Sequence, residues 1–209
     1  SGWSVSLSAD GDTVAIGASY NDDNGNNAGH VRIYEWDGTA WGKRGDDIDG
    51  EALGDSNGYA VSLSSDGSIV AIGAPLNDGN GEWSGHVRIY QWVDDEWTQL
   101  GEDIDGEAAE DRNGQSVSLS SDGNIVAIGA VLNSDAAKQA GHVRIFKWDG
   151  TAWSKRGGDI DGEAPEDQSG YSVSLSSDGG IVAIGSRYNS DGNGGRLSGH
   201  VRIYDWTND

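Results

Sequence analysis

Four histidines are the residues whose type and spacing first suggest chemistry in this chain. Each follows a glycine and precedes Val-Arg-Ile, and the copies are His30, His86, His142 and His200. Imidazole is a common metal ligand, so a recurring metal site is one hypothesis. However, each histidine stands alone in its stretch of sequence, and the chain has no cysteine. We therefore expect these histidines to make structural hydrogen bonds between repeated units.

The arginine two positions after each histidine is expected to join neighbouring units. Side chains alternate along a strand, so this arginine shares a face with the histidine. Its natural partner is a carboxylate, and an acidic bend, Asp-Ile-Asp-Gly-Glu, recurs at 47–51, 103–107 and 159–163. A tryptophan closes each motif. The predicted inter-unit residues are His30, Arg32, Trp36, His86, Arg88, Trp92, His142, Arg144, Trp148, His200, Arg202 and Trp206.

The acidic bend is itself a candidate calcium site. Its carboxylates flank a glycine, and calcium takes oxygen ligands of this kind. The spacing supplies fewer ligands than a complete calcium loop, and no other cofactor is expected. The candidate ligands are Asp47, Asp49, Glu51, Asp103, Asp105, Glu107, Asp159, Asp161 and Glu163.

The pattern predicts no enzyme. Every acidic motif repeats equally, whereas an active site needs one asymmetric set of residues. Aromatic side chains offer a different activity, because Trp41, Trp97 and Trp153 recur once per unit and indole rings stack on sugars. Packing between units is the favoured interpretation of these three. Trp83 has no counterpart in the other units and is a candidate ligand contact.

A repeat of 56 residues organises the chain. Val5, Val61, Val117 and Val173 occupy one place in a recurring phrase, and 61 − 5 gives the period. The units of this single repeat domain, 1–209, are 1–56, 57–112, 113–168 and an incomplete 169–209.

Each complete unit is expected to hold four strands. An alternating run at 4–8 is followed by an Asp10-Gly11 turn, which is a strong hairpin signal. A buried run at 14–17, the histidine motif and a last strand ending in the acidic bend complete the unit. Four short antiparallel strands per period indicate a β-propeller blade, with two packed sheets as the alternative. We therefore predict an all-β propeller of four antiparallel blades, the last of which lacks its fourth strand.

Three motifs together resemble the FG-GAP repeat: Gly-Tyr-Ser-Val-Ser-Leu at 170–175, Val-Ala-Ile-Gly-Ala-Pro at 70–75, and Gly-His-Val-Arg-Ile-Tyr. That repeat builds the seven-bladed propeller of integrin α chains and related extracellular proteins, which implies an extracellular or cell-surface location. Two departures stand out. The phenylalanine of the repeat is Asn57, Asn113 or Ser169 here, and its calcium loop, Asp-x-Asp-x-Asp-Gly, is reduced to Ser-x-Asp-Gly.

The composition excludes several partners. With 13 Lys and Arg against 35 Asp and Glu, the formal charge is −22, which repels nucleic acids and anionic membranes. No apolar run reaches the roughly 18 residues of a membrane span. The chain opens in mid-pattern at Ser1-Gly2-Trp3, so a mature product or excised segment is expected.

Taken together, these patterns predict a non-enzymatic, extracellular structural or adhesive protein that associates with itself. Two versions remain open for the missing strand. In one, the chain is a fragment of a larger propeller ring. In the other, four blades form the unit, the open edge of the last blade accepts a strand from a neighbouring copy, and repeated donation builds a filament. The alternative is a propeller lectin with one sugar site per blade. Glycans and extracellular proteins are therefore the other partners expected.

Overall fold

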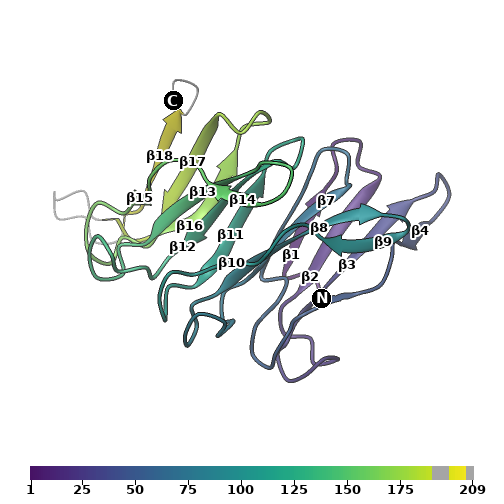
Figure 1. Ribbon diagram of the computed structural model, residues 1–209, viewed down its shortest axis with the longest axis horizontal. Coiled ribbons are helices and arrows are strands. Elements are labelled where there is room, and N and C mark those ends of the chain that lie inside the picture. Colours follow the sequence, from purple (N-terminus) through teal and green to yellow (C-terminus); the bar gives the residue numbers. More distant parts are fainter. Residues whose placement is uncertain (190–197, 206–209) are drawn as a thin grey trace.

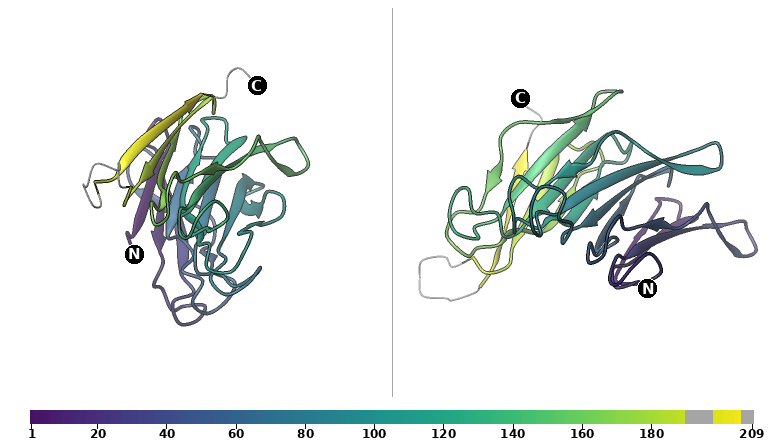
Figure 2. Two further views of the ribbon diagram at one scale, coloured as in Figure 1. Left: turned by 90° about the vertical axis from the view of Figure 1, so that its left-hand side faces the viewer. Right: turned by 60° about the horizontal axis from the view of Figure 1, so that its bottom comes forward.

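A computed structural model describes residues 1–189 and 198–205, and every regular element within these ranges is a β-strand. The strands form four antiparallel sheets that stand side by side in chain order, as Figure 1 shows. The sheet nearest the N-terminus and the one nearest the C-terminus lie at opposite ends of the row (Figures 1 and 2). Within the described residues, no helix has the length and apolar character needed to cross a membrane.

The first sheet shows how one blade is built. Its strands are β1 (Ser4–Leu7), β2 (Thr13–Ala18), β3 (His30–Trp36), β4 (Trp41–Lys43) and β5 (Ile48–Asp49). β1, β2 and β3 pair in sequence order, and β3 then pairs with both β4 and β5. The predicted fourth strand is therefore interrupted. Gly45 lies in the break with φ +76°, and a Cβ there would stand 2.6 Å from the Trp92 ring of the next blade.

The remaining sheets repeat this plan. The second contains β6 (Ala60–Leu63), β7 (Ile69–Ala74), β8 (His86–Val93), β9 (Glu96–Gln99) and β10 (Ile104–Asp105). The third contains β11 (Asn113–Leu119), β12 (Ile125–Ala130), β13 (His142–Trp148), β14 (Trp153–Lys155) and β15 (Ile160–Asp161). The fourth contains β16 (Ser169–Leu175), β17 (Ile181–Ser186) and β18 (His200–Asp205). The prediction of a four-bladed propeller whose last blade lacks a strand is confirmed.

The Asp-Gly turn between the first two strands of each blade uses its carboxylate internally. Asp10 Oδ1 accepts hydrogen bonds from Ser8 Oγ at 2.6 Å and from the Asp12 backbone N–H at 3.0 Å. These bonds, that from Ser8 first, lower the pKa of Asp10. The same Ser-to-Asp bond recurs at Asp66, Asp122 and Asp178. The residues at this turn therefore do not fit the calcium loop of the FG-GAP repeat.

The hydrophobic core lies between the blades. One cluster joins Val31 and Ile33 of the first blade to Leu63, Val70 and Ile72 of the second. Equivalent clusters join the second blade to the third and the third to the fourth. Fully burying an isoleucine or valine contributes about 1.5–3 kcal/mol, so each junction is a substantial source of stability. A blade is thus stabilised mainly by its neighbours.

Candidate functional site

The histidine of each repeat opens the third strand of its blade, and His86, His142 and His200 lie at the junction with the preceding blade. His30, His86 and His142 are almost completely buried, at 2%, 1% and 0% exposure. His200, at the end of the row, keeps 28% of its side chain exposed. The position of these rings therefore depends on a neighbouring blade.

Glu51 connects the first blade to the second. Its Oε2 atom lies 3.9 Å from His86 Nδ1, and its Oε1 atom lies 3.4 Å from Arg88 Nη1. The same histidine nitrogen lies 3.5 Å from Oδ2 of Asp103, in its own blade. One imidazole thus faces carboxylates from two blades.

The arrangement repeats at the other junctions. Glu107 lies 4.0 Å from His142 Nδ1 and 3.3 Å from Arg144 Nη1. Glu163 lies 3.7 Å from His200 Nε2 and 3.5 Å from Arg202 Nη1. In the first blade, which has no preceding blade in this chain, Asp23 of the polar loop approaches His30 at 3.9 Å.

Three sets of potential metal ligands result, and we call them the junction clusters. Among the described residues, the groups whose ligand atoms lie within 4.8 Å of one another are Asp23–His30–Asp47, Glu51–His86–Asp103 and Glu107–His142–Asp159.

The carboxylates of one acidic bend do not form a single site. Asp47 joins the cluster of its own blade, whereas Glu51 joins that of the next. Asp49, Asp105 and Asp161 belong to none of the clusters; their backbone carbonyls instead accept hydrogen bonds from Arg88, Arg144 and Arg202 at 2.6, 2.6 and 2.5 Å. Burial raises the pKa of Asp105. The three-carboxylate calcium site proposed for each bend is thereby split between two blades.

The buried imidazoles are neutral. Burial and the Arg88 guanidinium together lower the pKa of His86 to about 4. Burial likewise lowers the pKa of His142 and of His30. Neutral imidazole is the form that ligates metals.

Stability should therefore fall as the pH drops from about 6.5 towards 4. The folded-state pKa of His86 lies below its ordinary value of 6.5, so the unfolded chain binds the proton first. The contribution of neutral His86 to the free energy of unfolding is fully present above the unfolded-state pKa. Lowering the pH through this window removes about 3 kcal/mol of that contribution. The groups facing His86 are Arg88, which lowers its pKa, Asp103 and Asp55, which oppose that effect, and Glu51, whose Oε2 atom lies 3.9 Å from Nδ1.

The measurement is the melting temperature between pH 7 and pH 4.5 with a chelator present. A His86→Gln variant should show a shallower decline than the wild-type chain. Asp105 acts in the opposite sense near the lower limit, because its pKa is raised. Equal slopes for the two proteins would contradict the assignment.

The tryptophans of the second and third blades lie at the outer hairpins and contact the preceding blade there. Trp92 and Trp97 face each other across β8 and β9 with ring centroids 5.3 Å apart. Trp97 Nε1 donates to the Arg44 carbonyl of the first blade, and the Arg44 guanidinium lies 5.0 Å from the Trp92 ring. The pairs Trp36–Trp41 and Trp148–Trp153 repeat the ring contact. Trp206 lies outside the described residues.

Trp83 lies in the polar loop before β8, as expected. Its side chain is 42% exposed, its φ is +53°, and the Arg112 guanidinium lies 5.9 Å from the ring.

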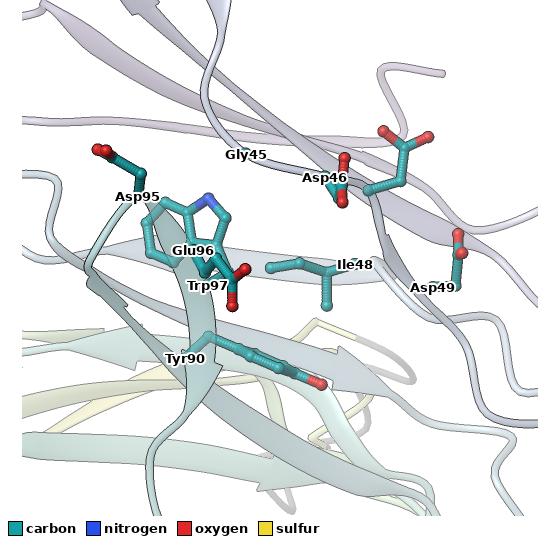
Figure 3. Close-up of a pocket in the computed structure, with 9 residues that line it drawn as sticks. Gly45, Asp46, Ile48, Asp49, Tyr90, Asp95, Glu96 and Trp97 are labelled. Carbon is teal, nitrogen blue, oxygen red and sulfur yellow. The ribbon is translucent and has the colours of Figure 1, made fainter.

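An acidic cleft of about 450 Å³ occurs at the junction of the first two blades. Figure 3 shows Asp46 and Asp49 of the first blade, and Asp95 and Glu96 of the second, around Ile48 and Tyr90. Trp97 and Asp47 complete the lining with Gly45. Among the described residues the acidic turn occurs only in the second blade, since Thr151 and Ala152 take the places of Asp95 and Glu96 in the third. The negative charge excludes anionic ligands from this cleft.

Sequence reasoning missed the role of Asn57. This residue is fully buried; its Nδ2 donates to the Ile48 carbonyl at 2.8 Å and its Oδ1 accepts from Arg88 Nη2 at 3.3 Å. Asn113 and Arg144 repeat the contact, and Ser169 replaces the amide beside Arg202. The signal was present, because these polar residues stand where the FG-GAP repeat has phenylalanine. Asp23 was also missed, and its variable loop carries no signal for it.

Comparison with known families supports this architecture. Residues 1–34 match the family profile of the FG-GAP repeat. This match over residues 1–34 confirms the resemblance to the FG-GAP repeat that the sequence motifs indicated. No match was found among curated protein sequences.

Solved structures share the fold of this chain. A protein of Bacteroides uniformis assigned as a 6-phosphogluconolactonase matches with TM-score 0.51 and 12% identity, over 98% of this chain and 67% of its own. A chain of the mitotic checkpoint complex matches with TM-score 0.58 and 18% identity, over 97% and 47%. The periplasmic gluconolactonase of Pseudomonas aeruginosa matches with TM-score 0.55 and 15% identity, over 94% and 56%. The chain thus spans about half the length of the last two proteins.

These likenesses correct the expectation that the chain is not an enzyme. Equal repetition of every motif was the reason for that expectation. Two of the three structures are described as lactonases, so a repetitive propeller scaffold is compatible with catalysis and the expectation was wrong. At 12% and 15% identity, the likeness shows the fold alone.

Proposed function

We propose that this chain is a structural assembly module, a segment of β-propeller whose two end blades bind head to tail to a second copy. The observation that carries the proposal is the exposure of apolar side chains on the two end faces. Apolar patches of this kind mark interaction sites on soluble proteins.

The outer face of the fourth blade presents Val201 and Ile203. These side chains are 66% and 71% exposed. Their counterparts in the third blade, Val143 and Ile145, are 0% and 1% exposed because the fourth blade covers them. The same residues in the same strand are thus buried wherever another blade follows.

The opposite face of the first blade presents Val5 and Leu7. They are 65% and 60% exposed. Leu63, the counterpart of Leu7 in the second blade, is 7% exposed because it packs against the first blade. The two ends of the row therefore carry the two halves of the surface that meets at every internal junction.

The end faces also carry the donor and the acceptor of a hydrogen bond that forms at every internal junction. At internal junctions, the backbone N–H groups of Leu63, Leu119 and Leu175 donate to Ser6, Ser62 and Ser118 Oγ of the preceding blade, each at 3.0 Å. Ser174 takes the serine position on the fourth blade and Leu7 the leucine position on the first. A head-to-tail contact would add this bond, and such contacts either close into a ring or extend as a filament.

Sedimentation velocity over about a hundredfold range of concentration tests the proposal. We expect the wild-type chain to form dimers or longer species, and more so at high salt, because salt screens repulsion between copies with a charge of −22. A variant with Val201→Asp and Ile203→Asp should remain monomeric. Leu7→Asp should do the same from the other end, and a mixture of the two variants should give a 1:1 dimer.

Val93→Asp is the matched control, because Val93 is 43% exposed but lies at a hairpin end of the second blade. It should leave association unchanged. A wild-type chain that stays monomeric throughout, a mixture that fails to dimerise, or an equal effect of the Val93 variant would each overturn the proposal. Circular dichroism of each variant verifies that the fold survives.

An extracellular setting is part of the proposal and is supported by the FG-GAP match. The lectin alternative is favoured by one observation, the cleft that combines Trp97 with Tyr90 and carboxylates. A glycan array probed with wild type and with Asp95→Asn, Glu96→Gln tests it: sugar binding that these changes abolish would support a lectin. Because the acidic turn occurs in the second blade alone, this version has one site in the described residues rather than one per blade.

A further inference from the structure

We propose that the junction clusters bind divalent transition-metal ions such as Zn²⁺, most tightly at Glu51–His86–Asp103. Each cluster combines one imidazole with two carboxylates whose ligand atoms lie within 4.8 Å of one another. In the two clusters between blades, the ligands come from both sides of the junction. A bound ion would therefore cross-link neighbouring blades.

The distances fit a small transition-metal ion. His86 Nδ1 lies 3.5 Å from Asp103 Oδ2 and 3.9 Å from Glu51 Oε2. Ligands bound at the usual 2.0–2.2 Å to tetrahedral zinc stand about 3.3–3.5 Å apart, so these two distances need only a slight contraction. Calcium requires about six to eight oxygen ligands, which one imidazole and two carboxylates do not provide. The imidazole favours zinc, nickel or copper instead.

The histidines of two clusters supply an independent indication of a ligand, whereas in His86 the buried nitrogen without a hydrogen-bond partner is Nε2. In His30 and His142, the Nδ1 atom near the carboxylates is buried and has no hydrogen-bond partner. Both side chains are at least 98% buried, at 2% and 0% exposure. A buried polar atom without a partner costs about 1–3 kcal/mol, and such atoms are uncommon in folded proteins. A metal ion at Nδ1 would satisfy this atom.

Each carboxylate is held in place by a contact to the one of its two oxygens that faces away from the histidine. Glu51 Oε1 is paired with Arg88 at 3.4 Å, which leaves Oε2 towards His86. Gln99 Nε2 donates to Asp103 Oδ1 at 2.6 Å, which leaves Oδ2 towards the same ring. Outer hydrogen bonds of this type hold metal ligands in place.

The charges beside each cluster predict the order in which the three clusters attract a divalent cation. Glu51 and Asp103 face one cation, Arg88, which gives a local charge of −2 + 1 = −1. At the next junction, Glu107 and Asp159 face both Arg144 and Lys155, which gives −2 + 2 = 0. In the first blade, Arg32 and Lys43 likewise neutralise Asp23 and Asp47. Gln99 stands in the position of these lysines, so its cluster attracts a dication most strongly.

The test is to titrate the chelator-treated protein with Co²⁺, followed by visible absorption, and with Zn²⁺, followed by calorimetry. We expect the wild-type chain to bind one equivalent of metal ion tightly. Gln99→Lys should weaken it at least about tenfold, and Lys155→Gln should add a second tight equivalent. Both side chains are partly exposed, so the fold is preserved. The sites are internal, and the result does not depend on association between copies.

Lys147→Gln is the control for net charge, because Lys147 is exposed on β13 outside the clusters. It should leave the stoichiometry unchanged, and His86→Gln should remove the tight equivalent. The proposal is overturned if the Gln99 and Lys155 variants bind like the wild type. Tighter binding of Ca²⁺ than of Zn²⁺, or an equal gain with Lys147→Gln, would also overturn it.

Discussion

Replacing Gly73 with alanine should destabilise the protein by about 3 kcal/mol or more, whereas the same change at Gly185 should cost far less. Both glycines are the penultimate residue of the second strand, in the second and fourth blades respectively. A Cβ at Gly73 would stand 2.1 Å from the Gly114 carbonyl oxygen and 2.9 Å from its carbon. These are backbone atoms of the next blade, so the clash is relieved only by moving two packed sheets apart.

Gly185 is the matched control because the described residues place no further blade against it. A Cβ at this position would meet Ser172 Oγ first, at 2.4 Å, and that atom is the end of a side chain that can rotate. Unfolding in urea gives both free energies. Similar losses at the two positions would show that the approach of neighbouring blades is not what requires glycine here.

The second large effect is expected at Arg88. Its Nη2 donates to the Asp49 carbonyl at 2.6 Å and to Asn57 Oδ1 at 3.3 Å, and its Nη1 lies 3.4 Å from Glu51 Oε1. Arg88→Ala would remove all three contacts, two of which reach the first blade, and leave a cavity. We expect the free energy of unfolding to fall by about 3 kcal/mol. This is the lower end of the usual cost of breaking a buried ion pair, because Glu51 is half exposed.

Arg32→Ala provides the comparison at the same repeat position. The Arg32 side chain is 37% exposed and contacts Asp47 of its own blade at 2.8 Å, so its removal should cost about 1 kcal/mol or less. Arg88→Lys should fall between the two, because an ammonium cannot reproduce the planar fork. Equal losses in denaturant unfolding for Arg32→Ala and Arg88→Ala would contradict an inter-blade role for Arg88.

Much of the fold follows from local sequence. The 56-residue period, the alternating run at 4–8 and the Asp10-Gly11 turn predict the number of blades and the first hairpin of each. These signals are local: side-chain alternation and the positive φ of glycine do not depend on what packs nearby. The interruption of the fourth strand was missed, because it depends on the Trp92 ring that packs against Gly45 from the next blade.

The sequence predicted which residues form the candidate site, but not which carboxylate lies beside which histidine. Histidine, arginine and the acidic bend were all identified as inter-unit groups, yet Asp47, Asp49 and Glu51 were assigned to one site. In the structure, Glu51 lies beside His86, which follows it by 86 − 51 = 35 positions in the chain. Spacing within a bend could not reveal this, because the twist of neighbouring sheets decides which carboxylate reaches across.

By itself, then, the sequence determined the repeat, the strands and the types of residue at each junction between blades. The tertiary structure alone decided which junction groups meet and which apolar faces stay uncovered. Ile145 and Ile203 occupy the same position in identical Val-Arg-Ile motifs, yet one is 1% and the other 71% exposed. The physical reason is that burial belongs to the contact between two blades, and a repeated sequence is the same whether or not a neighbour covers it.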